Sequence, residues 1–223
     1  MRKFMNAILV IALSLPISIH ARSEQASGRL LLENEQVLAV EHMIAAGGKL
    51  SLESQRPFLF FCVNPFAATL TFKDGHSIRG SFRVDDFRWF EQPIIAVANI
   101  GKSEAKFLIV EIKKNSPTSH RDLAPDDATK VATSVYQLLY ENDRVRVIRV
   151  ATRPGQKTAM HSHPGSTFRY SIATTKVRLT TPDGIIRELE NEAGVARWTE
   201  LATRHAHENI GTTKGHALLI EIK

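Results

Sequence analysis

The sequence contains one cysteine, Cys62, so the 223-residue chain cannot form an internal disulfide. Its fold must therefore depend on its hydrophobic core alone. Cys62 lies in the apolar run 58–63, where we expect a buried and unreactive thiol rather than a nucleophile. With 43% hydrophobic and 23% charged residues, the chain is too apolar for a disordered protein.

Clusters of Lys and Arg are also missing, although basic residues outnumber acidic ones by 29 to 23. A protein that follows nucleic-acid phosphates concentrates its cations on one face or along one helix. We therefore expect no nucleic-acid partner, in spite of a formal net charge of +6. No nucleophile triad, glycine-rich phosphate loop or paired carboxylates are evident in the sequence either.

The first residues follow the three-part pattern of a secretory signal peptide. A positively charged start at 1–3 is followed by an apolar run at 7–15 and by the small residues Ala21 and Ser23. The apolar run is too short to span a bilayer. We expect residues 1–23 to be removed, which predicts a periplasmic or secreted protein with no membrane partner. The alternative is an amphipathic or buried N-terminal helix.

The rest of the chain contains two copies of one pattern. Identical residues recur 108 to 110 positions apart and in the same order, which predicts a tandem duplication. The matched pairs include Asn34 with Asn142, Gly47 with Gly155, Asp74 with Asp183, Trp89 with Trp198, Asn99 with Asn209, Glu111 with Glu221 and Lys113 with Lys223.

The segment between the copies, 114–134, reads as a linker because it is rich in Pro, Ser and Asp and lacks apolar periodicity. Asp126 or Asp127 is a candidate N-cap for a short helix that runs toward Ser134.

Each copy consists of short alternating or β-branched runs separated by turn signals. This pattern predicts an all-β fold, with one small barrel or jelly roll at 28–113 and a second at 135–223. Closure into a barrel removes the exposed edges of the sheets.

Histidines are distributed unevenly, since five of the nine lie after residue 160. His161 and His163 are two positions apart, as are His205 and His207, so on an extended strand each pair shares one face. These imidazoles could converge on one divalent transition metal such as Fe, Zn, Mn, Ni or Cu. Three protein ligands would leave positions open for water or a small-molecule ligand.

The spacing of these residues resembles the two sequence motifs of the cupin superfamily. The matching residues are Gly155, His161 and His163 in the first motif, and Gly194, His205 and Asn209 in the second. The resemblance implies two tandem cupin-type jelly-roll barrels, a bicupin. It also implies a metal held in the second barrel by His161, His163 and His205.

The second copy departs from the motif at the glutamate that usually completes the metal site. That residue would fall at Thr167 or Phe168, so three ligands remain and the anionic one is missing. His207 is a candidate fourth ligand. The alternative for His207 is a partly buried side chain bonded to a neighbour.

The first copy has no matching set of ligands. Glu53 and Gln55 stand where the second copy has His161 and His163, and Ile95 or Ala96 stands where it has His205. We therefore expect the first barrel to be structural. A shift of one residue in this alignment would turn Glu53 outward.

Other residues carry weaker signals. Arg169 and Tyr170 could line the pocket, the first to bind an anionic substrate and the second to donate a proton, although alternate residues of a strand face outward. Trp89 and Trp198 occupy matching places, which favours core packing. Surface or hydrogen-bonding roles are expected for four other histidines, His42, His76, His120 and His216.

Two functions fit these observations. One is a metal-dependent enzyme, such as an oxygenase or an isomerase; the other is a non-catalytic cupin that binds a small molecule. The sequence leaves the substrate, the metal and any assembly into a homo-oligomer open.

If the signal peptide is removed, N-terminal sequencing of the native protein will begin near Arg22 or Glu24. An intact Met1 on protein recovered from the cytoplasm would contradict the predicted export.

Overall fold

The computed structural model describes residues 26–53, 56–114, 123–200 and 204–223. The expected signal peptide at 1–23 lies outside these residues, as do Gln55 and His120. Within the described part of the chain, no helix is long and apolar enough to cross a membrane.

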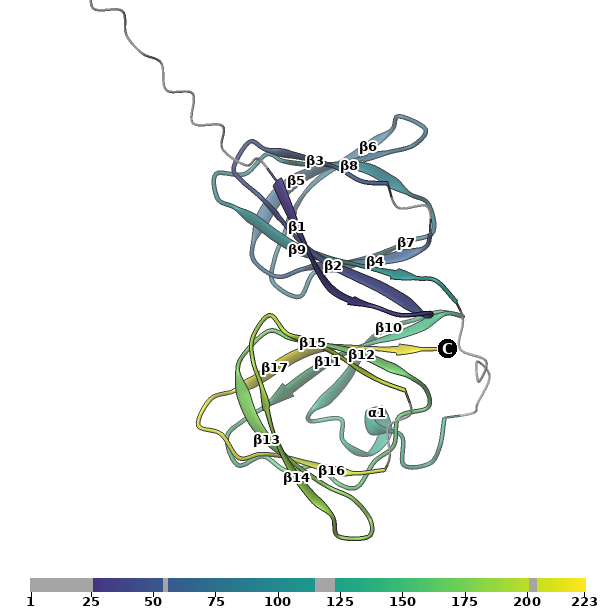
Figure 1. The fold of residues 1–223 in the computed structure, drawn as a ribbon, viewed down its shortest axis with the longest axis vertical. Helices are drawn as coiled ribbons and strands as arrows, with labels where there is room; N and C mark the ends of the chain where they lie inside the picture. Colours follow the sequence, from purple (N-terminus) through teal and green to yellow (C-terminus); the bar gives the residue numbers. More distant parts are fainter. Residues whose placement is uncertain (1–25, 54–55, 115–122, 201–203) are drawn as a thin grey trace, which may run out of the picture.

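Nine strands form the first barrel (Figure 1). They are β1 (Ala26–Glu33), β2 (Val37–Ile44), β3 (Lys49–Ser51), β4 (Phe58–Cys62), β5 (Phe66–Phe72), β6 (Ser77–Phe82), β7 (Phe87–Phe90), β8 (Ile94–Asn99) and β9 (Ala105–Ile112). One sheet has the order β1-β2-β9-β4-β7, and the other has the order β3-β8-β5-β6.

The second barrel follows a short helix, α1 (Ala128–Val131), and has the same arrangement. Its strands are β10 (Tyr136–Glu141), β11 (Val145–Thr152), β12 (Thr167–Ser171), β13 (Thr175–Thr180), β14 (Ile186–Asn191), β15 (Ala196–Thr199), β16 (Ala206–Asn209) and β17 (Gly215–Ile222). The sheets have the orders β10-β11-β17-β12-β15 and β14-β13-β16. The predicted all-β fold of two tandem jelly-roll barrels is confirmed.

The two five-stranded sheets pack against each other between the barrels (Figure 1). Their contact is a single apolar cluster that includes Leu59 and Phe61 from β4 and Phe168 from β12. Trp89 and Trp198 are partly buried against this cluster, which confirms a packing role for both. Burial of both faces of these sheets provides the core that a chain without disulfides needs.

Several matched residues make the same backbone contacts in both barrels. The amide oxygen of Asn34 accepts hydrogen bonds from the N–H groups two and three residues on, and Asn142 does the same. Gly47 has φ 75° and Gly155 φ 73°, and each donates its N–H to the carbonyl of the matched asparagine on the neighbouring strand. These contacts hold turns in place and support the duplication, which stays a prediction.

Within the linker, Asp127 rather than Asp126 caps α1. Its side chain accepts a hydrogen bond from the N–H of Thr129, two residues on. Asp126 instead pairs with Arg204, at 2.5 Å. The prediction of a capped short helix in this segment is confirmed.

Phenylalanine fills the interior of the first barrel. Its core cluster holds seven of the eleven phenylalanines, namely Phe58, Phe60, Phe66, Phe72, Phe82, Phe90 and Phe107. The second barrel has smaller or polar side chains at the positions that strand pairing matches to these: Thr167 for Phe58, Arg169 for Phe60, Thr175 for Phe66 and Asn191 for Phe82. The first barrel is therefore packed at sites where the second has room for a ligand.

Cys62 lies within the same phenylalanine-rich core and is fully buried, as predicted. Burial raises the pKa of its thiol to about 12, so the thiol stays protonated and unreactive at neutral pH.

Replacing Phe60 by alanine should destabilise the protein by about 3 to 5 kcal/mol, because the ring is fully buried and packs on Phe66, Phe82 and Phe107. Urea denaturation measures this loss. Leu30→Ala is the control, since Leu30 is 59% exposed and its loss should change stability by less than about 0.5 kcal/mol. Equal losses in the two variants would contradict this account of the core.

Candidate metal centre

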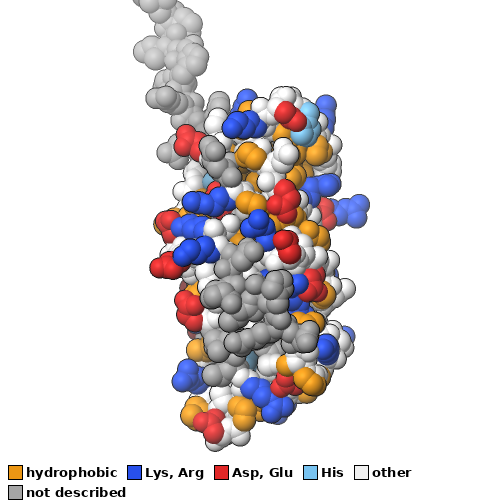
Figure 2. Space-filling view, turned by 90° about the vertical axis from the view of Figure 1, so that its right-hand side faces the viewer, with side chains coloured by type: hydrophobic (Ala, Val, Ile, Leu, Met, Phe, Trp, Pro, Cys, Tyr) orange, Lys and Arg blue, Asp and Glu red, His pale blue; other side chains and the backbone are white. Residues whose placement is uncertain are grey.

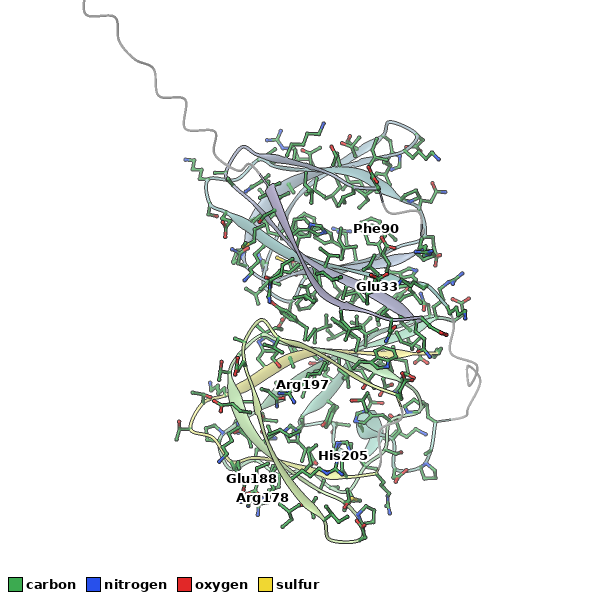
Figure 3. The ribbon with its side chains drawn as sticks, in the orientation of Figure 1. Glu33, Phe90, Arg178, Glu188, Arg197 and His205 are labelled. Carbon is green, nitrogen blue, oxygen red and sulfur yellow. The ribbon has the colours of Figure 1, made fainter. Side chains whose placement is uncertain are left out.

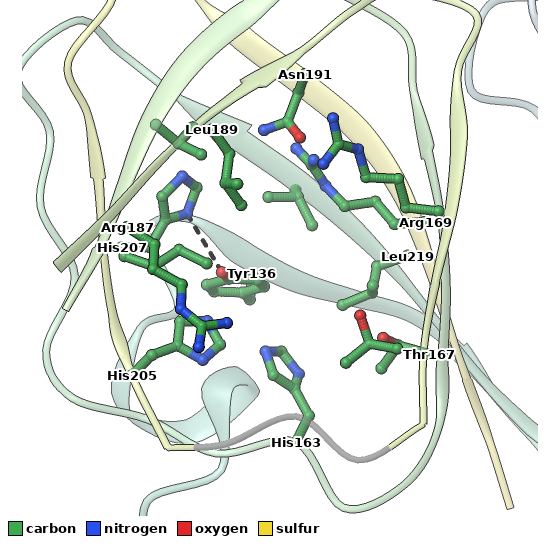
Figure 4. A pocket seen from close by; sticks show the side chains of 15 residues that line it. Tyr136, His163, Thr167, Arg169, Arg187, Leu189, Asn191, His205, His207 and Leu219 are labelled. Carbon is green, nitrogen blue, oxygen red and sulfur yellow. Dashed lines mark hydrogen bonds between the residues drawn. The ribbon is translucent and has the colours of Figure 1, made fainter. Parts of the chain in front are cut away.

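A cavity of about 430 Å³ lies inside the second barrel (Figure 4). Imidazole and phenol groups gather at one end, and Arg169 lies at another. Aliphatic side chains form the walls between them, from Val150, Val177, Leu179, Leu189 and Leu219. Figure 3 shows His205 and Arg197 within this barrel and Phe90 within the other.

Three histidines, His161, His163 and His205, bring one ring nitrogen each to within 4.8 Å of one another. Backbone pairing places two of them, because the N–H of His161 donates to the carbonyl of His205 and the reverse bond is also made, both at 2.9 Å. In the described part of the chain, these three form the single group of His, Cys, Asp or Glu able to hold an ion.

The geometry of this group fits a transition metal. Ligand nitrogens at ~2.1 Å from one ion lie at most roughly 4.2 Å apart, so modest side-chain rotation would bring all three into range. The Nδ1 atom of His161 lies 2.9 Å from the carbonyl oxygen of Ala159, so Nδ1 carries the proton. Its Nε2 atom is buried without a protein partner among the described residues, as a metal ligand would be.

Burial also favours the form of His161 that binds metals. Loss of solvent lowers the pKa of this imidazole to about 4, with a smaller contribution from the charges of His205 and His163. The ring is therefore neutral at pH 7, as coordination by nitrogen requires.

A buried carboxylate, Glu221 on β17, orients the second ligand. Its Oε1 atom lies 2.7 Å from Nδ1 of His163, which therefore donates and leaves Nε2 for a metal. Arg146 lies between Glu221 and Asp127 and bonds to both. All three charged side chains are at most 1% exposed. The chain thus places a carboxylate behind a ligand, although none occupies the glutamate position of the motif.

His207 lies outside the group of three. Its Nδ1 atom is 3.3 Å from the hydroxyl of Tyr136 (Figure 4), and burial lowers its pKa to about 3. This contact matches the alternative in which His207 bonds to a neighbour. Its Nε2 atom is buried without a protein partner among the described residues.

Arg169 and Tyr170 point in opposite directions, as strand alternation requires. Arg169 lines the cavity. Tyr170 instead donates its hydroxyl to Glu41 of the first barrel, at 2.6 Å. Tyr170 therefore lies away from the cavity and cannot donate a proton there.

Several side chains that line the cavity were not predicted from the sequence to do so. They are Tyr136, Thr167, Arg187, Asn191, Arg197 and Thr199. The signal that could have located them is the contrast between the copies, because nine phenylalanines lie at 58–107 and one, Phe168, lies in the second copy.

The alignment of Glu53 with His161 is wrong by one residue. The bond from the N–H of Leu52 to the carbonyl of Ile95 corresponds to the bond from His161 to His205, so Leu52 matches His161. The second copy has one residue more between its glycine turn and this bond. Glu53 is exposed, so it is no charge inside a barrel.

Two of the remaining histidines form the polar contacts expected of them, whereas His42 does not. His76 is exposed beside Asp74, and His216 lies 3.0 Å from Asp85. His42 is partly buried against Phe107, and its Nδ1 atom has no partner among the described residues. Burial lowers its pKa to about 4, so the expected surface or hydrogen-bonding role is corrected to a packing role.

Replacing Glu221 by glutamine should weaken the binding of Zn²⁺ by about 10- to 100-fold, because His163 loses the charged acceptor that fixes its orientation. Competition with a chelating dye measures the affinity. Glu111→Gln is the matched control at the same place in the first barrel and should leave the affinity unchanged. Equal affinities of Glu221→Gln and the unmodified protein would contradict this role.

Comparisons with known proteins support the fold. No family model matches the chain, and no curated protein matches its sequence. Among solved structures, AerE from Microcystis aeruginosa has a TM-score of 0.66 at 11% identity, over 91% of this chain and 95% of that one.

Two further structures are cupins or enzymes built on two such barrels. A cupin 2 conserved barrel domain protein from Leptotrichia buccalis has a TM-score of 0.55 at 13% identity, over 92% of each chain. A variant of oxalate decarboxylase from Bacillus subtilis has a TM-score of 0.60 at 15% identity, over 88% of this chain and 72% of that one. The chain therefore shares its fold with these structures, and the predicted cupin-type jelly-roll fold is confirmed.

Proposed function

We propose that the chain is an exported protein whose second barrel binds a divalent transition metal through His161, His163 and His205, together with a small molecule in the adjoining cavity. The observation that carries the proposal is the approach of three imidazoles to within 4.8 Å, with the buried Nε2 of His161 lacking a protein partner among the described residues. A group so arranged has little reason to form unless an ion occupies it.

The cavity supports a catalytic version of this function, a metal-dependent isomerase or oxygenase. A bound metal would act as a Lewis acid toward a ligand oxygen. Burial raises the pKa of Tyr136, so its hydroxyl stays protonated and can donate to a ligand. His207, 3.3 Å from that hydroxyl, can exchange a proton with it, and a reaction that moves a proton needs such a pair.

One observation favours the alternative, a non-catalytic small-molecule-binding cupin. Among the described residues that line the cavity, none is Asp or Glu. The cavity therefore lacks the carboxylate base that many proton abstractions use. Glu221 is withdrawn behind His163 and does not reach the cavity directly.

Elemental analysis of the native, untagged protein should find one Fe, Zn, Mn, Ni or Cu per chain. His161→Ala and His163→Ala should each lose it, because two imidazoles seldom retain a divalent ion against buffer. His76→Ala, which removes an exposed histidine of the first barrel, should keep the full metal content. Native protein without metal that also fails to take up Zn²⁺ or Mn²⁺ would contradict the proposal.

A further inference from the structure

We infer that the cavity of the second barrel binds a small organic anion, which Arg169 holds at a distance from the three histidines with help from Arg197. The inference names the class of small molecule in the proposed function and rests on it only for the metal. Figure 4 shows Arg169 beside Asn191, with His163 and His205 across the cavity.

Arg169 is a cation without an anion. Among the described residues, its guanidinium has no ion pair and no hydrogen bond to a carboxylate. Burial lowers the pKa of Arg169; Tyr136 opposes this shift, and the neighbouring cation Arg197 adds to it. A guanidinium stays charged at neutral pH in spite of such a shift, so its charge stays unneutralised inside the barrel.

Two other arginines of the second barrel are neutralised by carboxylates. Arg146, fully buried, contacts Asp127 and Glu221, and Arg178 on the outer surface contacts Glu188 at 2.7 Å. On the face in Figure 2, basic and acidic side chains are interspersed. Arg169 thus differs from Arg146 and Arg178, because no carboxylate among the described residues pairs with it.

The position of Arg197 adds to the free-energy cost of the unneutralised charge on Arg169. Arg169 and Arg197 stand directly opposite each other on β12 and β15, and like charges at such a pair destabilise a sheet. At the matched pair of the first barrel, Phe60 stands opposite Arg88 and no such repulsion arises. A shared anion would remove this repulsion, because each guanidinium binds an oxyanion through paired N–H groups.

The side chains that line the cavity indicate the chemical character of the rest of the ligand. Asn191 lies beside Arg169 and adds a hydrogen-bonding group for an oxyanion (Figure 4). Five aliphatic side chains separate this end from the histidines. The ligand is therefore a carboxylate or phosphate with a short apolar body that reaches toward the metal centre.

Isothermal titration with hexanoate, pentyl phosphate and the neutral hexanamide tests the inference. At least one of the two anions should bind about tenfold or more tightly than hexanamide, and the stronger of the two identifies carboxylate or phosphate as the ligand group. Arg169→Gln should remove this preference. Arg88→Gln, the first-barrel counterpart of an Arg197 substitution, should retain it.

Two further measurements separate binding from folding. Ligand-free Arg169→Gln should unfold at the same temperature as the unmodified protein or higher, since it loses an unpaired charge. If that variant does not fold, Arg197→Gln should weaken anion binding in its place. Equal binding of the anions and hexanamide, or unchanged hexanoate and pentyl phosphate binding by both variants, would overturn the inference.

The same titrations on chelator-treated protein distinguish this inference from the proposed function. Arginine-dependent anion binding by a protein that takes up no metal would uphold the inference and refute the metal site. Stoichiometric metal binding without any preference for anions would uphold the metal site and refute the inference.

Discussion

The contact between the two five-stranded sheets decides which residues can form a site. The central strands of each of these sheets are buried on both faces, by their own barrel on one side and by the other barrel on the other. On β12, Phe168 and Tyr170 therefore belong to the interface, and Arg169 belongs to the cavity. Glu41 is the acidic partner of Tyr170 across the interface. Burial alone would raise its pKa, but hydrogen bonds from Tyr170 and Arg29 keep it below its usual value.

The two barrels share one backbone arrangement but place their large interior side chains differently. Opposite His42 on the paired strand lies Gly28, whereas opposite Val150 in the second barrel lies Tyr136. The large side chain has changed strands between the copies. In the first barrel His42 packs on Phe107, and in the second Tyr136 packs on the histidines. Protein interiors tolerate substitutions that keep the total side-chain volume, as when a large side chain moves to a neighbouring strand. A phenylalanine-rich core and a ligand cavity can therefore be built on the same backbone arrangement.

The sequence predicted the strands, the two barrels and the three histidines, because alternation and spacing are local properties. The sequence could not show that Leu52, rather than Glu53, is the residue of the first barrel that corresponds to His161. This correspondence depends on which backbone groups pair across each barrel. Glu221 was also missed as a site residue. Its identity with Glu111, in the copy without the histidine ligands, indicates the repeat and carries no signal of a metal site. Its role follows from His163, which the first barrel lacks, and not from its own position.

The charges around the histidines explain how a site can work without the motif glutamate. Asp127 and Glu221 with Arg146 leave one net negative charge, buried directly behind His163. This charge acts on a metal through the imidazole, which it makes a stronger donor, and it leaves the coordination position of the missing glutamate open. A divalent ion would exceed that single negative charge, and Arg169 adds more positive charge across the cavity. Charges inside a low-dielectric barrel are poorly screened, so an excess of positive charge there is unfavourable. A negatively charged ligand would neutralise this excess.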